Sequence, residues 1–316
     1  MFALAIAVAV AMQSVPTAFT SGSGVANLPA TEDAPRVHDP STIVHDKDEY
    51  WLFATGPGVR SFHSAHLMRW LPGPPVLPSP PAWTHDVASD NRGYFWAPDV
   101  VRVNDRYLLY YSVSTWGKKT SAIGLATTRA LGSNWRDEGI VVRSNTNDDF
   151  NAIDPSVLLD TDGRLWMAFG SYWSGIKLVE LDPVTGKRLA CNAPMVSLAR
   201  HDSLEAACLY HHDSFYYLFV NWGQCCRGTN STYEIRVGRS VAVTGPFVDR
   251  DGIDMLQGGG TRFLGTSGSF VGPGHAGILR VGKEEWLSCH FYDGNRGGRP
   301  TLALRKLGWS KEGWPK

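Results

Sequence analysis

The sequence predicts an all-β fold built from five repeated units, and three observations support this prediction. Short runs rich in Val, Ile, Tyr, Trp and Phe alternate with turn signals such as Asp162-Gly163, while helical periodicity is nearly absent. The 33 Gly and 19 Pro residues provide for many turns. A strand–turn–strand unit also recurs along the chain, which is typical of repeat architectures. With 316 residues, of which 43% are hydrophobic, the chain can form one large all-β domain.

Each unit consists of a strand, a tight turn and a second strand. The first strands are expected at residues 38–44, 96–101, 153–159, 204–209 and 274–279, and the second strands at 50–53, 107–111, 165–169, 215–219 and 286–290. Alignment of the units gives one equivalent position, occupied in order by Asp39, Ala97, Asp154, Glu205 and His275, at intervals of 58, 57, 51 and 70 residues. These intervals suit four-stranded blades with loops, so we expect a five-bladed β-propeller over residues 35–316, with the Pro-rich stretch 71–81 as a loop of its first blade.

The equivalent position also predicts a functional site. The first strand of each blade lines the central channel of a propeller, so equivalent residues lie at one height around it. The carboxylates of Asp39, Asp154 and Glu205 and the imidazole of His275 are therefore expected to meet. A single Asp-Pro pair could be only a turn at the start of a strand. Three gathered carboxylates raise one another's pKa values and cost stability, so together they indicate a functional site.

Paired carboxyl groups of this kind suit hydrolysis of a glycosidic bond. One group protonates the leaving oxygen while the other activates a water on the opposite face of the sugar, with inversion when they stand roughly 6.5–9.5 Å apart. A third carboxylate can keep the acid protonated.

The candidate substrate-binding residues are Trp96, Ile153, Ser171 and Trp173. Trp96 offers a flat apolar face for a sugar ring, or packs between blades. Ser171 and Trp173 lie in a Gly-Ser-x-Trp-x-Gly run that suits a substrate-facing loop, or forms a plain β-bend.

The motifs together resemble the arabinan endo-1,5-α-L-arabinosidases of glycoside hydrolase family 43, from about His38 to the end of the chain. The motifs are His38-Asp39-Pro40-Ser41, Phe95-Trp96-Ala97-Pro98-Asp99-Val100, Ile153-Asp154-Pro155-Ser156, the run at 169–178, Gly223-Gln224-Cys225-Cys226-Arg227-Gly228, Ser231-Thr232-Tyr233, Val237-Gly238-Arg239-Ser240, Thr244-Gly245-Pro246-Phe247, Gly258-Gly259-Gly260-Thr261, Gly272-Pro273-Gly274-His275 and Gly313-Trp314-Pro315. The resemblance implies a five-bladed propeller and an inverting mechanism. It also implies that Asp39 is the general base, that Asp154 tunes and orients the acid, and that Glu205 is the general acid.

The resemblance further implies a metal ion near His275, commonly calcium. Because calcium prefers oxygen ligands, we expect His275 to bind it together with waters. From the residues alone, His275 could instead hydrogen-bond a carboxylate or pack in the channel floor.

The expected function is hydrolysis of internal α-1,5 bonds in plant cell-wall arabinan or arabino-oligosaccharides. The alternatives are an exo-acting α-L-arabinofuranosidase or β-xylosidase on the same propeller, and a carbohydrate-binding propeller without catalysis. A lectin propeller needs no axial acids, so the three carboxylates argue against the last alternative. Thirty Lys and Arg balance thirty Asp and Glu, which gives no electrostatic reason to expect nucleic acid or an anionic membrane as partner. We expect a monomer.

Residues 1–34 are expected to be a signal peptide and a flexible N-terminal segment. The apolar run at 2–12 is too short to span a bilayer and precedes small residues, as in a secretory signal, although a basic n-region is missing. A disordered or packed N-terminal arm is the alternative. We expect cleavage between Ala18 and Ala34 and a secreted protein, either extracellular or periplasmic.

The five cysteines do not predict a zinc cluster, because their number is odd and no CxxC spacing occurs. The adjacent Cys225 and Cys226 could form a vicinal disulfide, pair with other cysteines, or remain free thiols.

Overall fold

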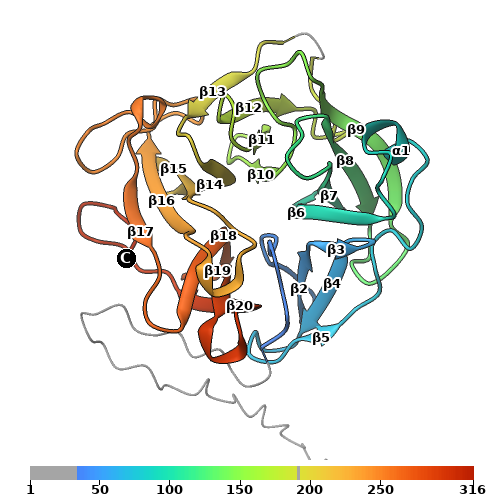
Figure 1. Ribbon diagram of the computed structural model, residues 1–316, viewed down its shortest axis with the longest axis horizontal. Coiled ribbons are helices and arrows are strands. Elements are labelled where there is room, and N and C mark those ends of the chain that lie inside the picture. The colour runs from blue at the N-terminus through green and yellow to red at the C-terminus, as the bar shows by residue number, and fades with distance from the viewer. Residues whose placement is uncertain (1–33, 191–192) are drawn as a thin grey trace, which may run out of the picture.

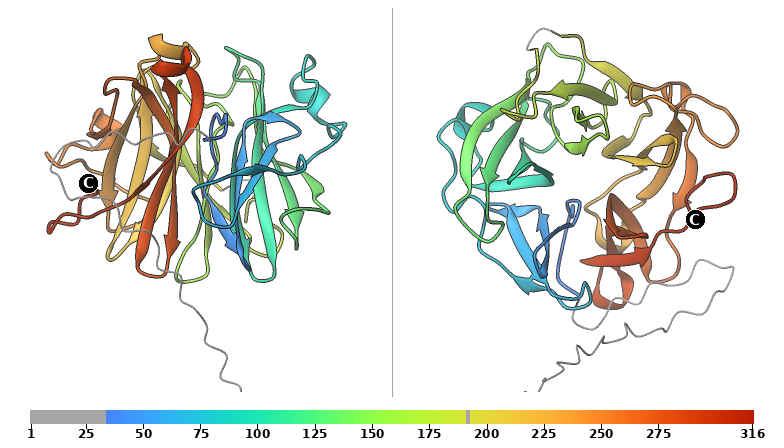
Figure 2. Two further views of the ribbon diagram at one scale, coloured as in Figure 1. Left: turned by 90° about the horizontal axis from the view of Figure 1, so that it is seen from below. Right: turned by 180° about the vertical axis from the view of Figure 1, so that it is seen from behind.

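Five antiparallel sheets are arranged around a common axis in the computed structural model, which describes residues 34–190 and 193–316 (Figure 1). The sheets follow one another around the ring in chain order, and the side view in Figure 2 shows their strands running roughly along the axis. The predicted five-bladed β-propeller is therefore confirmed. The predicted signal peptide and its cleavage site fall almost wholly on residues 1–33, which lie outside the described residues.

The blades contain the following strands. The first blade has β1 (Val44–Asp46), β2 (Glu49–Ala54), β4 (Arg60–Ser64) and β5 (Leu71–Pro72). The second has β6 (Tyr94–Val103), β7 (Arg106–Val113), β8 (Ser121–Thr128) and β9 (Arg136–Ser144), with β3 (Gly56–Pro57) paired to β6. The third has β10 (Ser156–Leu159), β11 (Leu165–Phe169), β12 (Ile176–Leu181) and β13 (Val196–Ala199). The fourth has β14 (Leu204–His212), β15 (Phe215–Trp222), β16 (Glu234–Ser240) and β17 (Thr261–Leu264). The fifth has β18 (Phe270–Val281), β19 (Glu284–Asp293) and β20 (Arg299–Lys306).

Helical segments are short in the described part of the chain. They are α1 (Thr84–Val87) and the 3₁₀ turns η1 (Gly228–Asn230), η2 (Met255–Gln257) and η3 (Gly294–Arg296). Among the described residues, no helix is long and apolar enough to cross a membrane.

The hydrophobic core lies between neighbouring blades. Strand β7 shows how the sequence produces this arrangement, because successive side chains of a strand point to opposite faces of the sheet. Leu109 and Tyr111 pack in a cluster with Phe53 of the first blade, whereas Leu108 and Tyr110 pack against the third blade. Both faces of β7 are therefore buried, and the strand reads as an uninterrupted run of large apolar and aromatic residues.

The two ends of the propeller meet at the outer edge of β20. Within residues 34–190 and 193–316, the fifth blade has three strands and not the four that were expected. The Val37 N–H donates to the Pro300 carbonyl and the Leu302 N–H donates to the Pro35 carbonyl, both at 3.2 Å. Residues 35–37 thus lie beside the last strand, which Figure 1 shows as blue chain against red. This pairing closes the ring between the start and the end of the domain.

Asp99 on β6 joins three blades through its buried carboxylate. Its Oδ1 accepts the Thr42 N–H of the first blade at 2.9 Å, and its Oδ2 accepts the Val157 N–H of the third blade at 2.8 Å. Burial raises the pKa of Asp99 to about 6, although these hydrogen bonds act in the opposite direction. In the next blade, Ser156 makes the equivalent bond by accepting the Leu209 N–H at 2.9 Å.

We expect Asp99→Ala to lower the free energy of unfolding by about 2–5 kcal/mol, because it leaves two backbone N–H groups without an acceptor at about 1–3 kcal/mol each. Urea denaturation at neutral pH measures this loss. Ser156→Ala is the matched control, since it removes one such acceptor and should cost about half as much. A change of less than 1 kcal/mol for Asp99→Ala would contradict this role.

Candidate active site

In each blade, one residue at or next to the aligned position, near the central axis, has a left-handed backbone conformation. These residues are Asp39 (φ 46°), Ala97 (φ 40°), Asp154 (φ 57°), Ala206 (φ 53°) and His275 (φ 58°). This conformation is unfavourable for residues other than glycine and tends to occur at functional sites. The structure therefore corrects the sequence alignment by one residue in the fourth blade, because Ala206 and not Glu205 is the equivalent of Asp39.

Pairing within the blades gives the same correction. Glu205 pairs with Asn221 as Trp96 pairs with Ser112, and each pair is followed by a bulge. Glu205 is thus equivalent to Trp96 and to His38, the residue before Asp39. The sequence alignment placed Glu205 opposite Asp39 because both are carboxylates. The bulge lets two successive residues of a strand reach the site, so Glu205 can lie there from the position before the left-handed residue.

Hydrogen bonds from each blade to the next hold the left-handed residues in place. The N–H groups of these residues donate to side chains at the end of the preceding blade's second strand: Asp39 to His290 Nδ1 (3.1 Å), Ala97 to Thr55 Oγ1 (2.8 Å), Asp154 to Ser112 Oγ (3.0 Å) and His275 to Asn221 Oδ1 (2.9 Å). Gly170 occupies this place in the third blade and has no side chain. The Ala206 N–H donates instead to the Asp154 carboxylate at 3.2 Å.

The two carboxylate oxygens of Asp39 have different surroundings. Oδ2 accepts the Thr55 hydroxyl at 2.6 Å and lies 2.8 Å from His38 Nδ1. Oδ1 faces His275 Nδ1 at 3.5 Å and His290 Nδ1 at 3.8 Å, which are too long for strong hydrogen bonds. Since His290 Nδ1 already accepts the Asp39 N–H, Oδ1 is the oxygen that remains available to another donor.

Asp39 is held in its ionised form. Burial raises the pKa of Asp39, but the positive charge and hydrogen bond of His38, together with the charges of His275 and His290, outweigh burial, and the pKa lies well below its usual range. A carboxylate that stays ionised and keeps one oxygen free can accept a proton from water.

Glu205 is buried on β14 and accepts one hydroxyl on each oxygen. Ser171 donates to Oε2 at 2.6 Å, and the Tyr233 hydroxyl donates to Oε1. Burial raises the pKa of Glu205, the two hydroxyls lower it, and the charge of Asp39 raises it again, with a net upward shift. The structure thus places Asp39 and Glu205 in environments that push their pKa values apart, as acid and base roles require.

Asp154 is also buried and interacts electrostatically with Glu205. Burial and the negative charge of Glu205 raise the pKa of Asp154 well above its usual value. The two groups therefore titrate as a pair that holds a proton at higher pH than isolated carboxyls would.

The candidate substrate-binding residues differ in how far they are exposed to solvent. Trp96 is partly exposed and contacts Trp116 edge to face, with ring centroids 6.4 Å apart. Trp116 is 70% exposed and Trp173 is 42% exposed, so both present aromatic surface to solvent. Ile153 is buried, and the Ser171 side chain is occupied by its bond to Glu205.

His275 is buried beside Asp39, and burial lowers its pKa despite the opposing effect of the Asp39 charge. Its imidazole is therefore neutral and has a lone pair that could bind a cation. Among the described residues, the groups of three or more side chains that could hold a metal are His38 with Cys225 and Cys226, and His38 with Asp39 and His290, and neither includes His275. Any ion bound by His275 would therefore need its other ligands from outside these two groups.

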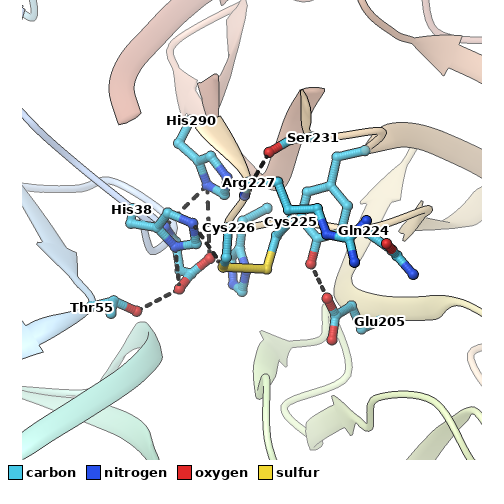
Figure 3. The surroundings of a disulfide bond; sticks show 12 residues. His38, Thr55, Glu205, Gln224, Cys225, Cys226, Arg227, Ser231 and His290 are labelled. Atoms are coloured by element: carbon cyan, nitrogen blue, oxygen red, sulfur yellow. Dashed lines mark hydrogen bonds and ion pairs between the residues drawn. A yellow bond between two sulfur atoms is a disulfide. The ribbon is translucent and has the colours of Figure 1, made fainter. Parts of the chain in front are cut away.

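A disulfide between Cys225 and Cys226 decides among the alternatives left open for these residues. Cys226 Sγ lies 3.6 Å from His38 Nε2. Figure 3 shows His38 and His290 together on one side of this disulfide. The remaining described cysteines, Cys208 and Cys289, are free and buried.

Sequence reasoning assigned no role to Thr55, His38, Tyr233, His290 or Trp116, although all but Trp116 contact Asp39 or Glu205. His38 and Tyr233 stand inside motifs that were recognised, and His290 ends the last repeat. Their positions were therefore visible in the sequence. The contact of His290 with Asp39 crosses from the fifth blade to the first, and that of Tyr233 with Glu205 joins separate strands of the fourth blade, so spacing did not reveal them.

Comparison with known proteins gives a family match over nearly the whole described chain. The model of glycosyl hydrolases family 43 matches residues 34–315. An extracellular endo-α-(1→5)-L-arabinanase of Bacillus subtilis is 39% identical over 288 residues, covering 88% of this chain and 87% of its own. An extracellular exo-α-(1→5)-L-arabinofuranosidase of Cellvibrio japonicus is 36% identical over 298 residues, covering 89% and 86%. The structure of a Cellvibrio cellulosa α-L-arabinanase complexed with arabinohexaose superimposes with a TM-score of 0.85 at 35% identity, over 90% of this chain and 95% of the other.

Proposed function

We propose that this chain, which belongs to glycosyl hydrolases family 43, cleaves internal α-1,5-L-arabinofuranosidic bonds of arabinan with inversion at the anomeric carbon. The observation that carries the proposal is that the pKa values of two carboxyl groups near the propeller axis are shifted in opposite directions. The pKa of Asp39 is held low by His38, while that of Glu205 is raised by burial. The family relatives named endo-arabinanases support the choice of substrate and bond.

Asp39 is the proposed general base. Its Oδ2 is saturated by Thr55 and His38, which fixes the carboxylate and leaves Oδ1 for water. Oδ1 takes a proton from that water as the water oxygen forms a bond to the anomeric carbon. The released sugar then carries the opposite anomeric configuration.

Glu205 is the proposed general acid, and its proton belongs on Oε2. Burial and the nearby carboxylates raise the pKa of Tyr233 well above its usual value, so its hydroxyl stays a donor to Oε1. The Ser171 hydroxyl can rotate to accept, because a serine is both donor and acceptor. Oε2 can therefore hold the proton and deliver it to the leaving glycosidic oxygen. Asp154 interacts electrostatically with Glu205, so that the two carboxyls titrate as a pair, and Asp154 holds the Ala206 backbone next to the acid.

We also propose that His275 holds a cation such as calcium with waters. When bound, the ion would supply a positive charge that further favours the ionised form of Asp39. The neutral imidazole of His275 is what supports this proposal.

Tyr233→Phe is expected to move the alkaline limb of the kcat/KM–pH profile upward by about one pH unit. The Tyr233 hydroxyl lowers the pKa of Glu205 by donating to its ionised form, so its removal should let Glu205 stay protonated to higher pH. Tyr216→Phe, which removes a hydroxyl bound to Asp160, is the matched control and should leave the limb in place. An unmoved limb in Tyr233→Phe would show that Glu205 is not the titrating acid.

Incubation with linear arabinan, arabino-oligosaccharides and xylan, followed by product sizing, tests the substrate and the mode of action. An endo-acting enzyme should release oligosaccharides of several lengths from arabinan at the start of the reaction. The exo-acting relative makes an exo mode the second candidate, and this mode would release a single short product throughout. Cleavage of xylan without cleavage of arabinan would overturn the proposed specificity.

We further propose that the protein is secreted and acts as a monomer. The relatives named extracellular support secretion.

A further inference from the structure

The turn that contains the disulfide lies next to the proposed base but has no place in the mechanism above. Cys226 is exposed and adopts a left-handed backbone conformation with φ 67°. The turn is closed on itself, because the Thr232 N–H donates to the Gln224 carbonyl at 2.9 Å and the Arg227 N–H donates to the Ser231 hydroxyl at 3.0 Å. Its backbone is therefore held in position beside His38.

A chain of hydrogen bonds runs from this turn to Asp39. The Cys226 N–H donates to the Tyr292 hydroxyl oxygen at 2.7 Å, and that oxygen lies 2.8 Å from His38 Nε2. His38 Nδ1 lies 2.8 Å from Asp39 Oδ2. The His38 ring is also stacked on His290, with centroids 4.1 Å apart, so its plane is fixed from the side.

This chain determines which nitrogen of His38 carries hydrogen. In the neutral ring, the ionised Asp39 carboxylate can only accept, so the single ring hydrogen lies on Nδ1, and Nε2 is left to accept the Tyr292 hydroxyl. In the charged ring both nitrogens carry hydrogen, and Tyr292 accepts from Nε2. In either state Nδ1–H points at Asp39 Oδ2, which leaves Oδ1 as the oxygen that accepts from water.

The disulfide holds the Cys226 end of this series of hydrogen bonds in place. A bond between neighbouring residues restricts the backbone angles of both, including the left-handed angle at Cys226 that an ordinary residue rarely adopts. The direction of the Cys226 N–H, and through it the position of the Tyr292 hydroxyl, therefore depends on the cross-link.

We propose that Tyr292 and the Cys225–Cys226 turn are positioning elements that act through His38 to orient the Asp39 carboxylate. The inference rests on the proposed function, because it assigns to these residues the support of the general base. Neither Tyr292 nor the disulfide needs to contact the reacting atoms for this role.

The test measures kcat and KM on arabinan for Tyr292→Phe and for the double variant Cys225→Ala with Cys226→Ala, each made with Asp39 intact and with Asp39→Asn. With Asp39 intact, we expect each change to lower kcat about tenfold with KM within twofold, since the base is misdirected while binding is kept. In the Asp39→Asn background, the same changes should have almost no effect, because residues that act through one group are not additive. Tyr216→Phe is the matched control and should leave kcat unchanged in both backgrounds.

An unchanged kcat in Tyr292→Phe, or an equal tenfold loss in both backgrounds, would overturn the inference. A nearly full activity of Asp39→Asn alone would instead overturn the proposed function, so the two failures are distinguishable. A second readout uses ¹⁵N NMR of His38 at a pH where its ring is neutral. The hydrogen should lie on Nδ1 in the wild type, facing the Asp39 carboxylate, and the Nε2 resonance should shift when Tyr292→Phe removes its hydrogen bond; an unshifted Nε2 resonance would also contradict the inference.

Discussion

Glu205→Gln is expected to lower kcat on arabinan by about 10²–10⁴-fold, the usual contribution of general acid catalysis. The glutamine keeps the shape of the side chain. Its oxygen can accept from Tyr233, and its amide can donate to Ser171, so the surroundings should be preserved. What is lost is the proton for the leaving oxygen.

The loss should shrink to less than about tenfold on an arabino-oligosaccharide with a dinitrophenyl leaving group, because such a bond needs little protonation. Glu284→Gln, at an exposed carboxylate paired with Lys306, is the matched control and should retain full activity on both substrates. Equal loss on both substrates would mean that Glu205 positions other groups instead of donating the proton.

Asp39→Asn should lower kcat by a similar factor on both substrates, because water must be activated whatever the leaving group. Thr55 and His38 donate to the Oδ2 position and will select the amide oxygen there. The amide NH₂ group then takes the Oδ1 position, where it cannot accept a proton from water.

Initial rates on arabinan and on the dinitrophenyl substrate measure this pattern. Asp105→Asn, at an exposed ion pair with Arg129, is the control for a loss of charge elsewhere and should be fully active. If Asp39→Asn recovered activity on the dinitrophenyl substrate, Asp39 would be serving the leaving group, and the roles assigned to the two carboxyls would have to be exchanged.

The repeat made most of the architecture predictable. Strand–turn–strand units with buried runs such as 107–111 could be aligned, and the alignment brought Asp39, Asp154 and His275 to equivalent places. It was wrong by one residue at Glu205, because it aligned the carboxylate with Asp39, whereas the left-handed backbone position of the fourth blade is occupied by Ala206. The closing contact of residues 35–37 with β20 was also invisible, since two backbone segments at opposite ends of the chain make it.

The environments of the carboxyls were less predictable than their positions. That Asp39 is held ionised depends on His38 in the same motif, and also on the charges of His275 and His290 from the fifth blade. Tyr233, which directly precedes β16 of the fourth blade, donates its hydroxyl to one oxygen of Glu205. The arrangement of the blades in space determines these contacts, because spacing along the sequence does not show which side chains bind the same carboxylate.

The anomeric configuration of the first products tests the central claim most directly. If Asp39 activates water opposite the leaving group protonated by Glu205, the new reducing end formed from an α-linked arabinan must be β. Proton NMR during the first minutes, before mutarotation, should therefore show the β-anomer rising ahead of the α-anomer. Early accumulation of the α-anomer would require a covalent intermediate and carboxyls only about 5–5.5 Å apart, and would contradict both the inverting mechanism and the role of Asp39.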